Sequence, residues 1–422
     1  MEDRSVIGKN QTPEPGTFFS MTPFKRTFLA LYIAVFMSSM GLGILSPILP
    51  AYVDSFGASS FVLGIVFGVY SAARTLFMTP VGILSDRFGR KPFILSGLLL
   101  FTIVSPLYAV ASDLSQLMMV RFLQGVAAAM LIPVAMSAIG DLSPRGKEGF
   151  VMGSFTSAFF AGLGFGPLIG GYMRDKYSMA AAFYAMGILS FLALLFTMGA
   201  LPREPGVGNR ERPWREGKER PEEGMGRKGE EESIWTDRAL WGLLFFRFTR
   251  AIGIGLVWVI MPLFAVKSLE ISAFQVGILL SANTFITTLL QSPTGHLSDR
   301  IGHRKSLTAG SALACAAVAF IAWARGFNDL LFASLALGLA GALIVPAGSA
   351  LAVSLGRTRG MGRTMGLYNS SLSLGTMLGP VIGGALLDHA GVETVFISGS
   401  VLGFLGWLAV ILMFPPKSGN RV

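Results

Sequence analysis

The hydrophobic positions of this 422-residue chain fall in long runs that are separated by short polar stretches. Each run is long enough to cross a hydrocarbon core of about 30 Å, which takes roughly 20 helical residues. The runs are too long and too uniformly apolar for the alternating strands of a membrane barrel, so we predict helices. The twelve predicted spans are 27–50, 59–81, 92–111, 114–140, 148–172, 179–201, 239–266, 272–294, 305–325, 329–355, 362–387 and 393–415.

Composition places these helices in a membrane rather than in a soluble core. The chain is 52% hydrophobic and only 14% charged, and it holds 52 glycines. A soluble fold of this length cannot bury so much apolar surface. We therefore predict an all-α membrane protein with twelve transmembrane helices in two six-helix bundles.

The net charge of +10 is explained by where the basic residues lie. Of the 34 lysines and arginines, 26 fall in the terminal tails and in the loops on the same side of the spans; four lie in loops on the other side and four within spans. By the positive-inside rule, both termini are expected in the cytoplasm. The protein itself is expected in the plasma (inner) membrane. This asymmetry accounts for the charge without a nucleic-acid partner, and no nucleic-acid-binding motif is present.

The polar segments predict the domain organisation: a tail at 1–26, a six-helix half at 27–201, a linker at 202–237, a second half at 238–415 and a tail at 416–422. The linker is rich in Arg, Glu, Gly and Pro, which indicates a flexible cytoplasmic segment. The first 24 residues lack an apolar core, so the first span, rather than a cleaved signal peptide, is expected to direct insertion.

The sequence gives no sign of a cofactor or a metal. The single cysteine, Cys315, excludes an intrachain disulfide, and the three histidines are far apart. We find no pairing of a nucleophile with a base and no metal-binding cluster, so the sequence does not indicate an enzyme.

The second half repeats the first at an offset of 213 residues. One offset relates nine pairs, which are Gly64 and Gly277, Pro80 and Pro293, Gly82 and Gly295, Asp86 and Asp299, Gly125 and Gly338, Pro133 and Pro346, Gly153 and Gly366, Pro167 and Pro380, and Asp175 and Asp388. Because each half has an even number of helices, the two halves are expected to run in the same direction across the membrane.

The most specific repeated pattern is a loop that follows the second span of each half. Its first copy contains Gly82, Asp86, Arg87, Gly89 and Arg90, and its second copy contains Gly295, Asp299, Arg300, Gly302 and Arg304. The first glycine of each copy permits close approach of a neighbouring helix and the second permits a tight turn. The acid can accept hydrogen bonds from a helix N-terminus across the interface, so the loop is expected to act as a latch between helices.

A second repeated pattern is a ladder of glycines in the fifth and eleventh spans. The residues are Gly162, Gly164, Gly166, Pro167, Gly170 and Gly171, echoed by Gly375, Gly379, Pro380, Gly383 and Gly384. Glycines four residues apart make one smooth helix face, and a proline removes a backbone donor and bends the helix. The pattern is consistent with a hinge, and it is equally consistent with a role only in helix packing.

Four arginines lie within predicted spans: Arg74, Arg121, Arg247 and Arg250. No Asp, Glu, Lys or His lies well inside any span, so an inner cavity would be positive. A charge within a span costs at least about 2.5 kcal/mol on insertion scales, so it is expected to face a cavity or a partner. Arg74 and Arg247 are also near enough to the cytoplasmic surface to extend their side chains to it.

On the loop, the glycine ladder and Arg121-Phe-Leu-Gln124-Gly125, the sequence resembles the major facilitator superfamily, over residues 25 to 415. Within that superfamily it resembles the twelve-helix branch of drug/proton antiporters, typical of exporters. The resemblance implies that Asp86 and Arg90, helped by Asp141, hold the cytoplasmic side closed. In the second half, His303 and Ser354 stand at the positions of Arg90 and Asp141, so this charge relay is expected in the first half only.

The resemblance also implies a central cavity lined by the first, fourth, seventh and tenth spans. The residues expected to contact substrate or a coupling ion are Arg121, Gln124, Arg247, Arg250 and Asn283. Arg121 and Gln124 belong to a motif that the superfamily associates with proton coupling, although a structural arginine is an alternative.

Three functions remain open from the sequence. The first is proton-coupled efflux of small amphipathic compounds or drugs by a monomeric carrier that alternates its access. The first span contains no carboxylate, however, although exporters of cationic drugs in this family usually place one in the first or fourth span. The second is therefore a carrier of organic anions or acidic metabolites, bound by Arg250 and Arg121 as forked donors. The third is a membrane sensor that does not transport.

Overall fold

The computed structural model describes residues 23–142, 148–201, 237–359 and 361–413. The tail at 1–22, most of the linker and the tail beyond residue 413 lie outside the described residues. The described chain is helical throughout, in agreement with the predicted all-α class. Its helices are α1 Pro23–Leu45, α2 Leu49–Ser55, α3 Ser60–Phe88, α4 Arg90–Val110, α5 Leu114–Leu142, α6 Glu148–Lys176, α7 Met179–Ala200, α8 Arg238–Ser268, α9 Ala273–Ile301, α10 His303–Ile321, α11 Phe327–Arg359 and α12 Met361–Met413.

Several boundaries differ from the expected spans. The second and eighth spans, expected to end at residues 81 and 294, continue as α3 to Phe88 and as α9 to Ile301. The positions of Gly82, Asp86, Gly295 and Asp299 therefore lie within helices, and not in loops as expected. The first span ends at Leu45 rather than at residue 50, because Pro47 cannot donate a backbone hydrogen bond, and the short helix α2 follows. The predicted eleventh and twelfth spans form one continuous element, α12, which is broken at Gly391, where φ is 79°. This break lies between the two predicted spans, so α12 contributes two crossings.

Nine segments of the described residues are long and apolar enough to cross a bilayer on their own, with α12 counted once. The helices α6 and α10 are not among them. The helix α10 has 19 residues and begins with His303, Arg304 and Lys305, which shortens its apolar part. These two helices therefore depend more on their neighbours for burial.

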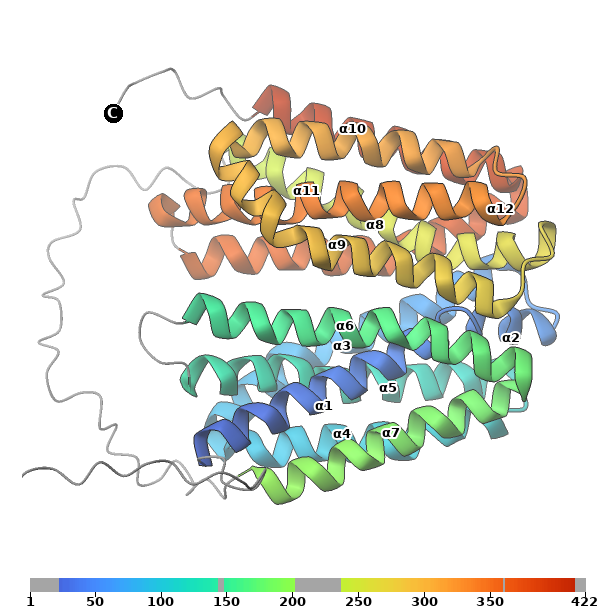
Figure 1. Cartoon of the computed structure of the whole chain (residues 1–422), viewed down its shortest axis with the longest axis vertical. Helices are drawn as coiled ribbons and strands as arrows, with labels where there is room; N and C mark the ends of the chain where they lie inside the picture. The colour runs from blue at the N-terminus through green and yellow to red at the C-terminus, as the bar shows by residue number, and fades with distance from the viewer. Residues whose placement is uncertain (1–22, 143–147, 202–236, 360, 414–422) are drawn as a thin grey trace, which may run out of the picture.

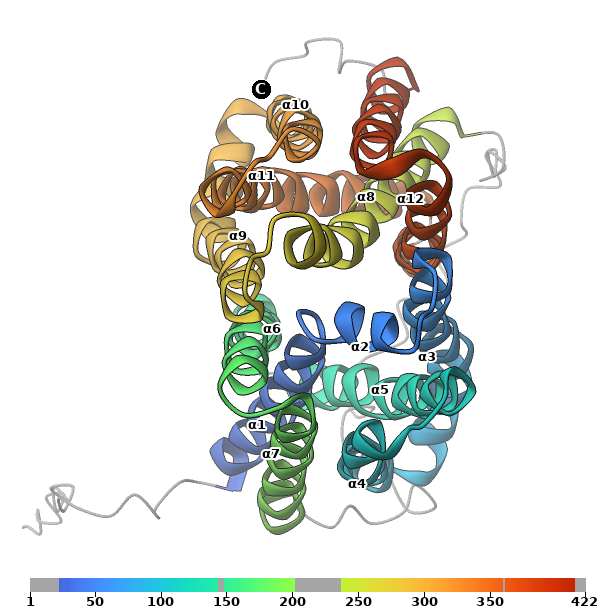
Figure 2. The same cartoon turned by 90° about the vertical axis from the view of Figure 1, so that its right-hand side faces the viewer.

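The helices form two bundles that lie side by side (Figures 1 and 2). The helices α1–α7 form the N half, and α8–α12 form the C half. We name the two ends of the molecule by their turns. The Gly89 end carries the turns at Gly89 and Gly302, and the Gly391 end carries the break in α12 and the short helix α2, on the right of Figure 1.

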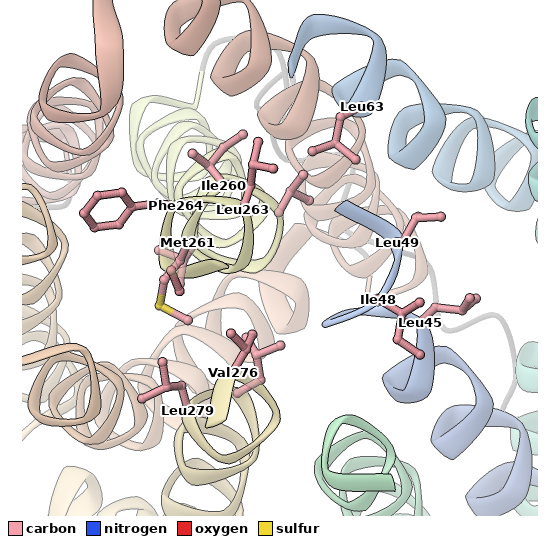
Figure 3. Close-up of a cluster of buried hydrophobic side chains, with 14 of the residues drawn as sticks. Leu45, Ile48, Leu49, Leu63, Ile260, Met261, Leu263, Phe264, Val276 and Leu279 are labelled. Carbon is pink, nitrogen blue, oxygen red and sulfur yellow. The ribbon is translucent and has the colours of Figure 1, made fainter. Parts of the chain in front are cut away.

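The buried apolar side chains show where the halves are joined. One cluster contains residues of both halves near the Gly391 end, among them Leu45, Leu49, Leu63, Ile260 and Leu279 (Figure 3). Toward the Gly89 end, a second cluster contains residues of α1, α4 and α5 but none of the C half, and a third contains residues of α8 and α11 but none of the N half. The described core is thus shared at one end and divided at the other.

Most glycines of the ladder hold helices together inside each half, whereas Gly171 and Gly384 lie against the backbone of Ala273 and Ser60 in the opposite half. A Cβ on Gly162 would lie 2.2 Å from the carbonyl oxygen of Phe36, and Cβ atoms on Gly166 and Gly170 would lie 2.3 Å from those of Met40 and Ile44. The ladder in α6 therefore packs directly on the backbone of α1.

The second ladder makes the corresponding contact in the C half. A Cβ on Gly379 would lie 2.6 Å from the carbonyl oxygen of Ile252, and one on Gly383 would lie 2.3 Å from a methyl carbon of Leu256. Both residues belong to α8, so α12 packs on α8 as α6 packs on α1. Pro167 and Pro380 instead approach the opposite half, where their carbonyl oxygens lie against Gly277 and Gly64.

Two aspartates join the halves at the Gly391 end by capping helices of the opposite half. The Asp388 carboxylate accepts hydrogen bonds from the backbone N–H groups of Ser60 (2.9 Å) and Phe61 (2.8 Å), at the start of α3. These N–H groups have no partner within their own helix, and the positive end of the helix dipole favours a carboxylate there.

The repeat supplies a matching cap on the other side of the interface. The Asp175 carboxylate accepts from the N–H groups of Ala273 (3.3 Å) and Phe274 (2.7 Å), at the start of α9. Each residue of this second cap lies 213 positions from its counterpart in the first. Asp54 and Lys267, which are also 213 positions apart, form an ion pair between the halves at the same end.

The ladder contact leads to a stability prediction. We expect Gly166→Ala to lower the melting temperature of the purified protein in detergent, because the added methyl meets the α1 backbone and overpacking costs about 1–3 kcal/mol. The control is Gly199→Ala, at a helical position where an added Cβ meets no atom within 4 Å. An unchanged melting temperature for both variants would show that the α1–α6 contact can relax at no cost.

The aspartate caps lead to a conformational prediction. We expect Asp388→Asn and Asp175→Asn each to shift the balance toward states open at the Gly391 end by about two- to fivefold, since a carboxylate at a helix N-terminus contributes about 0.3–1 kcal/mol. Spin labels at Ser55→Cys and Ser268→Cys, in a Cys315→Ser background, report the separation of the halves. Asp329→Asn is the control, because its carboxylate accepts from Arg325 N–H within the C half. Identical distance distributions in all three variants would contradict the assignment.

Candidate functional site

A cavity of about 550 Å3 lies between the two halves. The helices α1, α5, α8 and α11 each contribute to its wall, as expected for the first, fourth, seventh and tenth spans. The wall also contains residues of α3, α6, α9, α10 and α12. A volume of this size accommodates a small organic molecule.

All four arginines found within the predicted spans line this cavity. Arg74 and Arg121 come from the N half, and Arg247 and Arg250 come from the C half. No aspartate, glutamate, lysine or histidine is among the described residues of the wall. The positive cavity expected from the sequence is therefore present in the described structure, with guanidinium groups on both sides of it.

Arg121 is held in a pocket of aromatic rings. Its side chain is 3% exposed, and its guanidinium carbon lies 4.8 Å from the ring centre of Phe67, 5.8 Å from that of Tyr70 and 5.9 Å from that of Tyr108. The faces of these rings carry partial negative charge, which stabilises a cation that has been removed from water. Because α3 and α4 supply the rings, the packing of these helices against α5 determines where the guanidinium points.

Gln124 fixes the orientation of Arg121. Its side-chain oxygen accepts hydrogen bonds from Arg121 Nη1 (3.0 Å) and from the Tyr108 hydroxyl (2.6 Å), and its side chain is fully buried. The Nε and Nη2 atoms of Arg121 are buried and form no hydrogen bond with described residues. Two guanidinium donors thus remain available at the edge of the cavity.

Arg247 and Arg250 provide the charge of the C half. Both lie on α8, three residues apart and hence on the same face of the helix. The guanidinium carbon of Arg247 lies 4.5 Å from the ring centre of Tyr368 on α12. The Nε atoms of both arginines are buried and form no hydrogen bond with described residues, so the two guanidinium groups retain donors for a ligand.

The rest of the wall is mainly apolar and aromatic. Phe67, Tyr70, Phe159, Phe160 and Trp258 contribute rings, while Asn283 and Thr287 contribute polar groups. Such a surface accommodates the apolar body of a ligand, and the guanidinium groups bind a charged end. The arrangement suits an amphipathic anion.

Among the expected substrate residues, the structure brings together Arg121, Arg247, Arg250 and Asn283 at the cavity. Gln124 lies behind the wall and acts through Arg121. Arg74 and Arg247 were expected to be within reach of the cytoplasmic surface, and both line the cavity. The sequence does not single out Phe67, Phe159, Phe160 and Tyr108, because aromatic residues in an apolar span give no sign of the face on which they lie.

The expected gate residues lie at the Gly89 end. Gly89 and Gly302 make the turns, with φ of 93° and 95°, a range that favours glycine. Arg87 stacks on Phe88, Arg90 is half-buried, and Asp299 and Arg300 are exposed. The side chains of Asp86 and Asp141 lie outside the described residues.

The close helix contact expected at Gly82 and Gly295 is wrong for this conformation. A Cβ on Gly82 would meet no atom within 4 Å, and one on Gly295 would meet only the Pro346 side chain, at 3.7 Å. The described core is divided between the halves at this end, so no helix of the opposite half presses on either glycine. The close approaches of glycine across the interface occur instead at Gly64 and Gly277.

The described residues contain no group of three or more His, Cys, Asp or Glu side chains that could hold a metal ion. The described cavity wall presents guanidinium groups, an amide, hydroxyls and ring faces, which can bind and release a ligand.

Comparison with known proteins connects this architecture to a family. The sequence model of the Major Facilitator Superfamily matches residues 31–249 and 243–422. An uncharacterized MFS-type transporter of Methanocaldococcus jannaschii is 26% identical over 405 residues, which cover 92% of this chain and all of that protein. The quinolone resistance protein NorA of Staphylococcus aureus is 30% identical over 173 residues, 41% of this chain and 44% of NorA.

Solved structures share the fold. A bacterial homolog of the human lysosomal transporter Spinster, in an inward-facing and occupied conformation, aligns with a TM-score of 0.76 at 14% identity, covering 93% of this chain and 97% of that one. The human organic anion transporter MFSD10 (TETRAN) aligns with a TM-score of 0.63 at 18% identity, over 92% of this chain and all of that one. The family match spans both halves and the central cavity, and the chain belongs to the major facilitator superfamily of membrane transporters.

Proposed function

We propose that this protein is a secondary transporter that exports small amphipathic organic anions by alternating access. The observation that carries the proposal is the cavity wall, in which four arginines from both halves occur with no described carboxylate. A carboxylate or phosphate can bind such guanidinium groups through paired, charge-assisted hydrogen bonds. A lipophilic cation would meet only like charge there.

The wall also supports the amphipathic part of the proposal. The ring of Trp258 on α8 and those of Phe159 and Phe160 on α6 lie on opposite halves and line the same cavity as Arg250. An apolar or aromatic ligand body gains free energy by leaving water for this surface. Binding then uses both the charge and the body of the ligand, and it excludes small hydrophilic anions by lack of apolar contact.

Export and sidedness follow from the distribution of charge and from the relatives. Basic residues gather in the loops of the Gly89 end, so we assign that end to the cytoplasm, with both termini inside and the protein in the plasma membrane. The halves are joined at the Gly391 end, so this conformation would receive substrate from the cytoplasm. Similarity to a drug-resistance protein over part of the chain and the glycine–proline run of α6 favour export.

Proton-driven export of drugs is the second candidate, supported by the Arg121–Gln124 pair and by NorA. Its coupling carboxylate would have to lie outside the described cavity wall. Asp54 is a candidate, although it already pairs with Lys267 at the Gly391 end. For this reason the cavity favours the anion carrier.

A ligand panel tests the substrate class. We expect aromatic carboxylates, sulfonates and phosphates to raise the melting temperature of the purified protein, and lipophilic quaternary ammonium compounds of the same size to leave it unchanged. The physical reason is that guanidinium groups repel a cation and pair with an anion. Stabilisation by the cations alone would overturn the anion proposal and favour drug export.

Substitution of Arg250 tests the site itself. We expect Arg250→Gln to weaken the binding of the stabilising anion roughly 10- to 100-fold, because a hydrogen bond to a charged group contributes about 1.5–3 kcal/mol. The matched control is Arg325→Gln, which removes an exposed arginine outside the cavity wall. Binding measured by calorimetry that is equal in both variants would remove Arg250 from the site.

A further inference from the structure

The charge of the cavity bears on how transport is driven, as well as on what is bound. Arg74 and Arg121 face Arg247 and Arg250 across the space between the halves, with no described acid in the wall. The arginines that contact ring faces, Arg121 and Arg247, are partly stabilised by them. Neither Arg74 nor Arg250 has such a ring contact within the described residues, and the described wall supplies no acid to pair with either.

Alternating access requires this charge to be enclosed. In the described conformation the halves share a core only at the Gly391 end. To open that end, the halves must close at the Gly89 end, and the cavity then passes through a state with little contact with bulk water. Guanidinium groups that repel one another in such an enclosed space are strongly unfavourable unless a counter-charge enters with them.

A guanidinium cannot remove this obstacle by releasing a proton. A cavity that contains a carboxylate can become neutral by binding a proton, so an empty carrier of that kind can return across the membrane. Arginine stays charged at any physiological pH. The empty cavity therefore keeps its charge, and only a bound anion can compensate it.

We propose, on the basis of the anion transport proposed above, that this protein is an obligatory anion exchanger. An amphipathic anion leaves the cell through the cavity, and the carrier returns with a second anion bound in its place. The loaded carrier changes conformation quickly because its guanidinium charge is balanced. The empty carrier changes conformation slowly because its charge is not.

Countertransport in liposomes tests this inference. The purified protein is reconstituted into vesicles, and uptake of labelled 2-naphthalenesulfonate, an aromatic anion that is ionised at all working pH values, is measured. One set of vesicles contains unlabelled 2-naphthalenesulfonate, a second contains inorganic phosphate, and a third contains only a zwitterionic buffer and sucrose. We expect uptake into the first set to be at least tenfold faster than into the third, with or without a pH gradient. The phosphate vesicles show whether the returning anion must be amphipathic.

A pair of variants connects the exchange ratio to the charge. Arg74→Gln removes one charge from the wall, so we expect the ratio of loaded to empty uptake to fall several-fold. Arg74→Lys keeps the charge and should keep the ratio, which a purely structural role of Arg74 would not predict. Arg325→Gln, outside the cavity, is the control and should behave as the unmodified protein.

The outcomes separate this inference from the proposed function. Equally rapid protein-dependent uptake into anion-free vesicles, or uptake driven by a pH gradient alone, overturns the exchange mechanism and leaves the anion carrier in place. An equal ratio in Arg74→Gln and Arg74→Lys overturns the role assigned to charge. If 2-naphthalenesulfonate and the other anions of the panel neither bind nor cross, the proposed function fails, and the exchange mechanism fails with it.

Discussion

Close contact between helix backbones is the constraint on which this structure depends. In a bilayer, apolar side chains gain little by leaving lipid for a helix neighbour, so the helices are held by dispersion contacts and by interactions of the backbone. Glycine allows these contacts because it has no side chain to separate the helices. At Gly162, Gly166 and Gly170, the helix α6 lies on the carbonyl groups of α1. At Gly64 and Gly277, the same kind of approach joins one half to the other.

The contacts that hold the helices together are repeated in the two halves, but the arginines of the cavity are not. The capping aspartates and the packing glycines recur at the offset of 213 residues, and Asp54 pairs with Lys267, the residue at its own equivalent position. The four cavity arginines do not recur. Their counterparts at the same offset are Thr287, Ser334, Ala34 and Met37, none of which is ionisable. The repeated contacts thus form a symmetric frame, whereas the charge on each wall of the cavity comes from positions that differ between the halves.

Sequence alone predicted the fold because membrane helices are determined by local composition. The spans, the repeat and the arginines within spans are all properties of single segments. The packing of one segment on another is different, since it depends on which face of each helix is turned inward. Tyr108 and Phe67 look like ordinary apolar residues in the sequence, and only the packing of α3 and α4 on α5 brings them to Arg121.

The helix caps between the halves also show that packing between segments cannot be predicted from a single segment. The sequence indicated that an acid could cap a helix across the interface and placed this role at Asp86, whose side chain lies outside the described residues, and at Asp299. In the described structure Asp175 and Asp388 make such caps, and Asp299 is exposed. The acid of the repeated motif therefore predicted the type of contact. Which acid makes that contact depends on which helix N-terminus lies next to it in space, and the sequence does not show this.

The polar contacts at the Gly391 end are weak enough for cavity charge to control the transport cycle in the mechanism proposed above. Asp175 and Asp388 are exposed, and an exposed ion pair or helix cap contributes only about 0–1 kcal/mol. A few such contacts can favour one conformation without trapping the protein in it. Enclosing the guanidinium groups costs more, at about 2.5–3.5 kcal/mol for each arginine on insertion scales. In the proposed exchange mechanism, the cost of enclosure depends on whether an anion is present and the gate contacts do not. Occupancy of the cavity would then determine when the halves exchange their open ends.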